Sequence, residues 1–64
     1  MTRKDYVIIA DSIKGSINYE QSFNNNQAAV SALRFLALTL SSSLEEENPR
    51  FDRDRFLDAC GVSN

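Results

Sequence analysis

Residues 28–40, AAVSALRFLALTL, decide the fold of this 64-residue chain. Ten of these thirteen residues are apolar, which favours a buried helix. A helix that packs on one side of a small core needs a single apolar stripe. Such a stripe is present in this segment as Ala29, Leu33, Leu36 and Leu40. Because further apolar residues lie around most of the circumference, we expect this helix to be covered on more than one side.

The helix built on this segment is predicted to span residues 27–46. The amides of residues 24–26 favour turns and N-caps, so we place the cap at Asn25 or Asn26. Pro49 ends the helix. Residues 41–43 are serines and residues 45–47 are glutamates, which place low helix propensity and negative charge at the negative end of the helix dipole. We therefore expect the last turns to fray.

A first helix is predicted to begin at Thr2, which forms a capping box with Asp5. Apolar residues then recur at helical spacing, forming a core-facing stripe of Tyr6, Ile9, Ala10, Ile13 and Ile17. Gly15 leaves the end of this helix open, since it is either a C-terminal cap or a weak point inside a longer helix. Residues 18–26 are predicted to be a loop in which Tyr19 and Phe23 fold back over the core.

A short third helix follows Pro49. Asp52 is its predicted N-cap, and Phe51 and Phe56 flank it as a hydrophobic staple. Its C-terminal end is predicted to be a Schellman motif formed by Leu57, Gly61 and Val62. The sequence thus predicts an all-α, three-helix domain over residues 1–64, with two longer helices and a short C-terminal one. Since a chain of this length buries a small core, we expect homodimer packing to complete it.

The composition of the chain disfavours several classes of function. The formal net charge is −2, histidine is absent and Cys60 is the one cysteine. This composition disfavours nucleic-acid binding, a metal site, a disulfide framework and known catalytic constellations. We therefore expect a cytoplasmic protein that is no enzyme, has no cofactor and does not enter a membrane. Cys60 is expected to be a small buried apolar contact near a helix C-terminus.

Arg50, Arg53 and Arg55 form the candidate anion-binding or partner-binding site. Guanidinium groups bind phosphate and carboxylate well, so a nucleotide ligand or a host protein is a candidate partner. In the alternative interpretation, these arginines pair with Asp52, Asp54 and the glutamates of residues 45–47 as exposed ion pairs of small stability.

A second candidate site is a self-association interface on the long central helix. The apolar residues that fall off its core-facing stripe are the expected contacts. They include Val30, Phe35 and Leu38, and we add Leu33 from the stripe itself. Exposed apolar surface of this kind is typical of homodimers with two-fold symmetry.

Both ends of the chain resemble known sequences. Residues 2–6, TRKDY, residues 8–10, IIA, and residues 48–61, NPRFDRDRFLDACG, are similar to small proteins of bacteriophage and prophage genomes. This resemblance implies a host-cell location and no particular activity. It supports an accessory protein that inhibits or sequesters a host defence component, and an oligomeric structural or virion-accessory protein is the alternative. A transcriptional regulator is disfavoured, because no basic recognition helix is evident.

Overall fold

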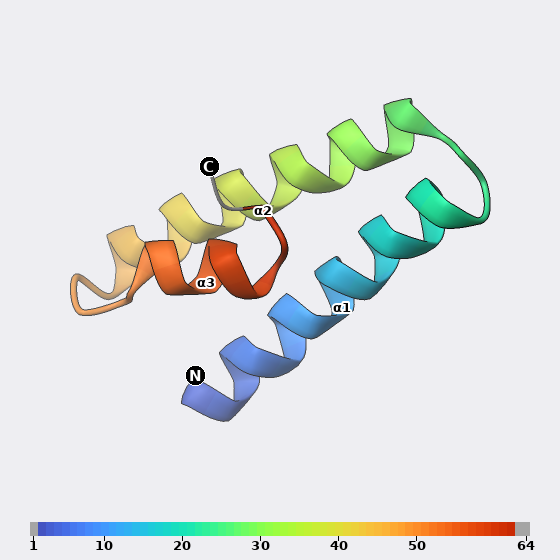
Figure 1. The fold of residues 1–64 in the computed structure, drawn as a ribbon. Helices are drawn as coiled ribbons and strands as arrows, with labels where there is room; N and C mark the ends of the chain where they lie inside the picture. The colour runs from blue at the N-terminus through green and yellow to red at the C-terminus, as the bar shows by residue number, and fades with distance from the viewer. Residues whose placement is uncertain (1, 63–64) are drawn as a thin grey trace.

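The computed structural model describes residues 2–62 and contains three helices: α1 (Arg3–Ser22), α2 (Gln27–Glu47) and α3 (Arg53–Ala59). α1 and α2 form an antiparallel hairpin, and α3 lies across one side of it, toward the end where α1 begins (Figure 1). The predicted all-α architecture of two longer helices and a short third one is confirmed.

The capping box at the start of α1 is confirmed. The Thr2 backbone N–H donates to Asp5 Oδ2 at 3.0 Å, and the Asp5 N–H donates to Thr2 Oγ1 at 3.4 Å. The helix continues through Gly15 to Ser22, so the predicted loop over residues 18–26 is wrong in its first five residues. Ile17 is buried against the core and holds this last part of the helix in place.

The tight turn between α1 and α2 uses two adjacent asparagines. Asn25 has a φ of +47°, a left-handed conformation that asparagine tolerates better than most residues. The Asn26 side chain accepts a hydrogen bond from the Ala29 N–H at 3.1 Å, which confirms the predicted N-cap. The backbone conformation of Asn25 reverses the chain, and the side chain of Asn26 caps α2. A longer loop is therefore not needed.

The aromatic residues at this turn do not cover the core, contrary to prediction. Tyr19 is 56% exposed and Phe23 is 80% exposed, and their ring centroids lie 5.5 Å apart. Since α1 continues past Tyr19, this side chain lies about 200° around the helix from Ile17 and points away from the core.

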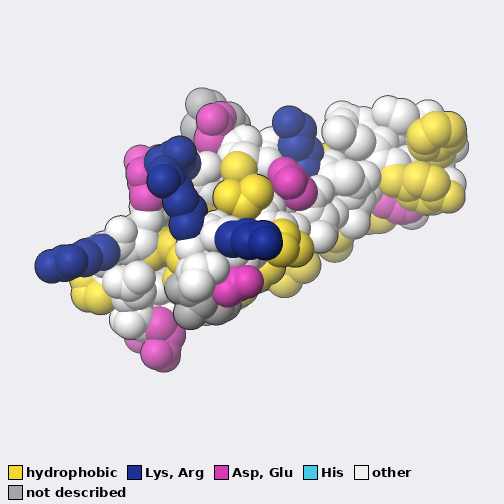
Figure 2. All heavy atoms as spheres, turned by 90° about the horizontal axis from the view of Figure 1, so that it is seen from below, with side chains coloured by type: hydrophobic (Ala, Val, Ile, Leu, Met, Phe, Trp, Pro, Cys, Tyr) yellow, Lys and Arg dark blue, Asp and Glu magenta, His cyan; other side chains and the backbone are white. Residues whose placement is uncertain are grey.

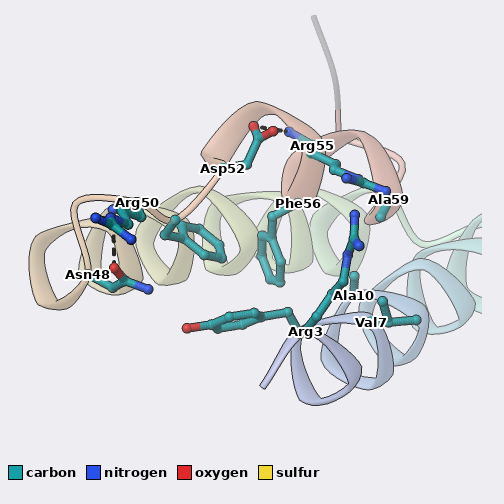
Figure 3. A pocket seen from close by; sticks show the side chains of 11 residues that line it. Arg3, Val7, Ala10, Asn48, Arg50, Asp52, Arg55, Phe56 and Ala59 are labelled. Carbon is teal, nitrogen blue, oxygen red and sulfur yellow. Dashed lines mark hydrogen bonds between the residues drawn. The ribbon is translucent and has the colours of Figure 1, made fainter. Parts of the chain in front are cut away.

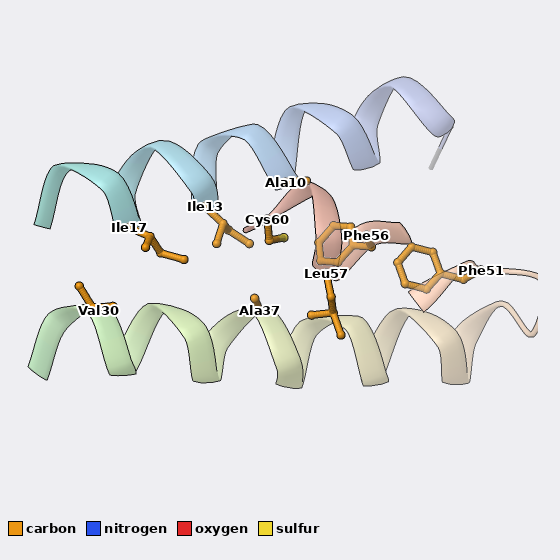
Figure 4. Packing of buried hydrophobic residues seen from close by; sticks show 9 residues of the cluster. All are labelled: Ala10, Ile13, Ile17, Val30, Ala37, Phe51, Phe56, Leu57 and Cys60. Atoms are coloured by element: carbon orange, nitrogen blue, oxygen red, sulfur yellow. The ribbon is translucent and has the colours of Figure 1, made fainter. Parts of the chain in front are cut away.

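The core lies between the three helices (Figure 4). Its members are Ala10, Ile13 and Ile17 of α1, Val30 and Ala37 of α2, Phe51, and Phe56, Leu57 and Cys60 at the C-terminal end. The stripe predicted on α1 faces this core, with Tyr6 and Ile9 half-buried. The stripe predicted on α2 is rotated, because α3 covers Ala37 and Ser41 while Leu36 stays 50% exposed.

Both end signals of α3 are confirmed. Asp52 Oδ1 accepts from the Arg55 N–H at 3.1 Å, and the Phe51 and Phe56 rings of the staple lie 5.4 Å apart. At the other end Gly61 has a φ of +77°, and the Val62 N–H donates to the Leu57 carbonyl at 2.9 Å, as a Schellman motif requires.

Candidate functional site

The structure separates the three arginines of the predicted anion site. Arg50 and Arg55 line one pocket, whereas Arg53 is half-buried between α2 and α3. Arg53 Nε donates to Ser41 Oγ at 3.3 Å, so this side chain takes part in the helix packing and does not line the pocket with Arg50 and Arg55. Positions 53 and 55 are about 200° apart around the helix, so the two side chains point in nearly opposite directions.

Arg3 is the third arginine that lines the pocket, and the sequence did not indicate it. It stands at the first position of α1, and the packing of α3 against α1 brings it to the same pocket as Arg55 (Figure 3). No local pattern connects Arg3 with residues 50–55, since the contact depends on how the helices pack.

The pocket has a volume of about 350 Å³ and lies between the start of α1, the connection after α2, and α3. Three aromatic rings form a row along it. The Tyr6 and Phe51 ring centroids are 4.9 Å apart with an interplanar angle of 58°, and Phe51 and Phe56 are 5.4 Å apart with an angle of 56°. Phe51 and Phe56 are buried, while Tyr6 is half-buried. The pocket therefore joins an apolar wall to a basic rim.

The basic rim has free hydrogen-bond donors. Among residues 2–62, the one hydrogen bond that an arginine side chain donates is that of Arg53 to Ser41. The alternative in which the arginines bind Asp52, Asp54 or the glutamates of residues 45–47 thus finds no hydrogen bond in this part of the chain. Asp52 also lines the pocket, but its carboxylate serves as the N-cap of α3. A guanidinium group is a positively charged hydrogen-bond donor with no acceptor, so the chemistry of this rim is suited to an anion.

Basic side chains gather at this end of the molecule. Figure 2 shows lysine and arginine side chains, with aspartate and glutamate side chains among them, over the part that carries α3 and the N-terminal half of α1, whereas exposed apolar side chains lie among polar ones at the hairpin tip. This end of the molecule therefore has charges of both signs, in keeping with the formal net charge of −2.

The predicted self-association residues have different environments in α2. Phe35 is 70% exposed and Leu38 is 39% exposed, in keeping with a surface role. Val30 is buried in the core beside α1, so its assignment to an interface is wrong. Leu33 is half-buried and packs against the core. Leu36, which was assigned to the core-facing stripe, instead joins the exposed apolar surface.

The outward side of α2 is nearly free of charge. Between Gln27 and Leu44, Arg34 is the one charged residue. Small uncharged residues surround the exposed Phe35 at helical spacings of three, four and seven: Ala28, Ser31, Ala32, Thr39 and Ser42. Surface helices usually place charged residues on the side that faces water, so this face is unusual for one that remains in solvent.

Cys60 is completely buried and belongs to the core, as expected. Burial raises the pKa of its thiol, which disfavours the reactive thiolate. In the described part of the chain, no three histidine, cysteine, aspartate or glutamate side chains are grouped as a metal site. None of the three helices has the length and apolar content needed to cross a bilayer.

Comparison of the chain with protein-family models, with curated proteins and with solved structures gives no match. The resemblance of the two ends to phage proteins therefore stays a prediction. Two features of the structure bear on function: the pocket lined by arginine and aromatic side chains, and the exposed face of α2.

Proposed function

We propose that this protein acts by binding, not by catalysis, and that it does so as a homodimer joined through α2. The observation that carries this proposal is the exposed, nearly uncharged face around Phe35, whose ring is 70% exposed. Burial of apolar surface contributes about 25 cal/mol per Å², so covering this face with a second copy would stabilise a core that is small in one chain.

The face is suited to contact with itself. In a two-fold contact centred on Phe35, position i of one copy lies opposite position 70 − i of the other. Leu38 then meets the small side chains of Ser31 and Ala32 in the second copy, and Ala28 meets Ser42. Large side chains therefore fall opposite small ones, which lets two helices approach closely.

The charges at the ends of α2 favour an antiparallel pair. The first turn of α2 contains no acidic residue, and its last turn contains no basic residue. Both ends of the helix dipole are therefore uncompensated within one chain. In an antiparallel pair, the glutamates of residues 45–47 approach the positive start of α2 in the second copy. A parallel pair would instead place the two glutamate runs side by side.

The size of the molecule allows such a contact. A standard protein interface buries ~800 Å² per partner, which is about a sixth of the 4675 Å² surface of this chain. α2, with 21 residues, is about 30 Å long and provides a contact of this order.

The test is the molar mass in solution, measured by light scattering on a sizing column at micromolar concentrations. We expect a dimer for the wild type and a monomer for Phe35→Glu, because the acid would be buried without a partner charge. Ile8→Glu is the matched control, since it adds the same charge at an exposed apolar residue of α1, outside the proposed contact. A monomeric wild type, or equal dissociation by both substitutions, would contradict the proposal.

The resemblance to phage proteins supports one biological setting for such a module. In this setting the dimer is an accessory protein that inhibits or sequesters a host defence component. An oligomeric structural or virion-accessory role is the alternative, and the same measurement distinguishes the two. A closed dimer at all concentrations supports the binding module, whereas continued growth with concentration supports the structural role.

A further inference from the structure

We infer that the pocket between α1 and α3 binds a small ligand in which a phosphate group is attached to a flat aromatic ring, as in a mononucleotide. This inference does not rest on the proposed dimer. The pocket is formed within a single chain, and the exposed residues Phe35, Leu36 and Leu38 do not line it. Loss of either property would therefore leave the other in place.

Two like charges from different helices line one end of this pocket. Arg3 extends from α1 and Arg55 from α3 toward the same end of the pocket (Figure 3). Neither guanidinium donates a hydrogen bond within residues 2–62, so both retain free donors in the lining of one pocket. Two adjacent guanidinium groups repel one another, and a doubly charged phosphate both removes this repulsion and accepts several of their hydrogen bonds.

A row of aromatic rings lines the same pocket as these arginines. Phe51 and Phe56 are held in place by burial, and the half-buried Tyr6 ring contacts Phe51 at a centroid distance of 4.9 Å. Tyr6 is therefore the ring of this wall that is accessible for stacking or edge contact with a planar ligand, and the two buried rings support it. Arg50 lies beyond the row, at the opposite end of the pocket from Arg3 (Figure 3).

The volume of the pocket fits a small ligand. A volume of about 350 Å³ lies near the lower end of the range for ligand pockets, roughly 300 to 1,000 Å³. This volume is of the order that a single nucleotide requires. The phosphate is assigned to the end with Arg3 and Arg55, and the base to the aromatic row.

The experiment compares three probes by thermal shift and calorimetry with the full chain: AMP, adenosine and inorganic phosphate. AMP is expected to raise the melting temperature and to bind at about millimolar concentration or below, while each fragment binds more weakly. Arg3→Ala and Arg55→Ala should each weaken AMP binding by about tenfold or more, since each removes a charge-assisted contact. Arg34→Ala removes the same charge elsewhere on the surface and should leave AMP binding unchanged.

The aromatic wall has its own test. Tyr6→Leu should weaken AMP binding and leave the weak binding of inorganic phosphate unchanged, because only AMP carries a ring. Chemical shifts of the Tyr6, Phe51 and Phe56 rings should move with AMP in the wild type. The inference is overturned if AMP has no effect, if AMP binds no better than phosphate, or if Arg34→Ala weakens binding as much as Arg3→Ala.

Discussion

Arg53 reaches from α3 to α2 and donates a hydrogen bond from Nε to Ser41 Oγ, 3.3 Å away across twelve positions of sequence. Ser41 is completely buried, and its hydroxyl also donates to the Leu38 carbonyl at 2.8 Å. The serine is therefore satisfied on both sides, as buried polar groups generally are. This hydrogen bond holds α3 against α2. It also explains why Arg53 does not line the pocket with Arg50 and Arg55.

We predict a coupling free energy of about 1 kcal/mol between these two side chains, the usual net value of a protein hydrogen bond. A double-mutant cycle with Ser41→Ala and Arg53→Met, followed by urea unfolding, measures it. Methionine keeps the apolar stem of the arginine in place. The control cycle pairs Arg53→Met with Ser43→Ala on the exposed side of α2, where the effects should add. Additive effects in both cycles would show that the hydrogen bond is not formed in solution.

The two glycines should respond to alanine in opposite directions. Gly15 lies inside α1 with no heavy atom within 4 Å of an added Cβ, so Gly15→Ala should raise the free energy of unfolding by about 0.5 to 1 kcal/mol. Gly61 has a φ of +77°, where alanine is strained, so Gly61→Ala should lower this free energy by about 1 to 2 kcal/mol. Urea unfolding of the two variants checks both signs, and a stabilising Gly61→Ala would argue against the Schellman end of α3.

Stability should depend on pH through the capping box of α1. Hydrogen bonds from Thr2 hold the pKa of the Asp5 carboxyl below its usual value of 3.8. Since the unfolded chain takes up this proton first on acidification, the stabilisation is present above pH ~4 and is lost as the pH falls through the folded pKa. Wild type should therefore be more stable than Asp5→Asn near neutral pH, and the difference should shrink in acid. Urea unfolding at several pH values measures it, and a constant difference would contradict the assignment.

Disulfide cross-linking should report the orientation of the proposed dimer. Cysteine is placed singly at three positions of the exposed face, by Ala28→Cys, Phe35→Cys and Ser42→Cys. In an antiparallel pair centred on Phe35, only the central position meets itself, since the outer positions lie about 21 Å from their copies. We expect rapid oxidation of the central variant alone. Native Cys60 is buried, so the wild type is the unreactive control. Cross-linking at all three positions would indicate a parallel pair.

The ends of the helices were predictable from the sequence because they depend on contacts between near neighbours. Thr2 with Asp5, Asn26 with Ala29 and Asp52 with Arg55 are all bonds over three residues. The extension of α1 through residues 18–22 was missed, because asparagine and an aromatic residue favour loops only weakly and the packing of Ile17 outweighs them.

The candidate sites were only partly predictable. Arg50 and Arg55 could be proposed for an anion site because they are close in sequence. Phe35 could be proposed for an interface because α2 contains more apolar residues than one stripe needs. Arg3 gave no local signal, and nothing in the sequence placed Val30 inside or Leu36 outside. Which sector of α2 is buried depends on where α3 packs, and this contact lies between residues distant in the chain.

The amino-acid sequence alone predicts the three helices, the side-chain cap at the start of each, and a second helix with more apolar residues than one core-facing stripe needs. The rotation of α2, the burial of Ser41 and the presence of Arg3 and Arg55 in one pocket follow instead from how the three helices pack. The physical reason is the range of the interactions. Capping bonds act within one helical turn, whereas side-chain packing between helices selects one arrangement among many that the same local pattern allows.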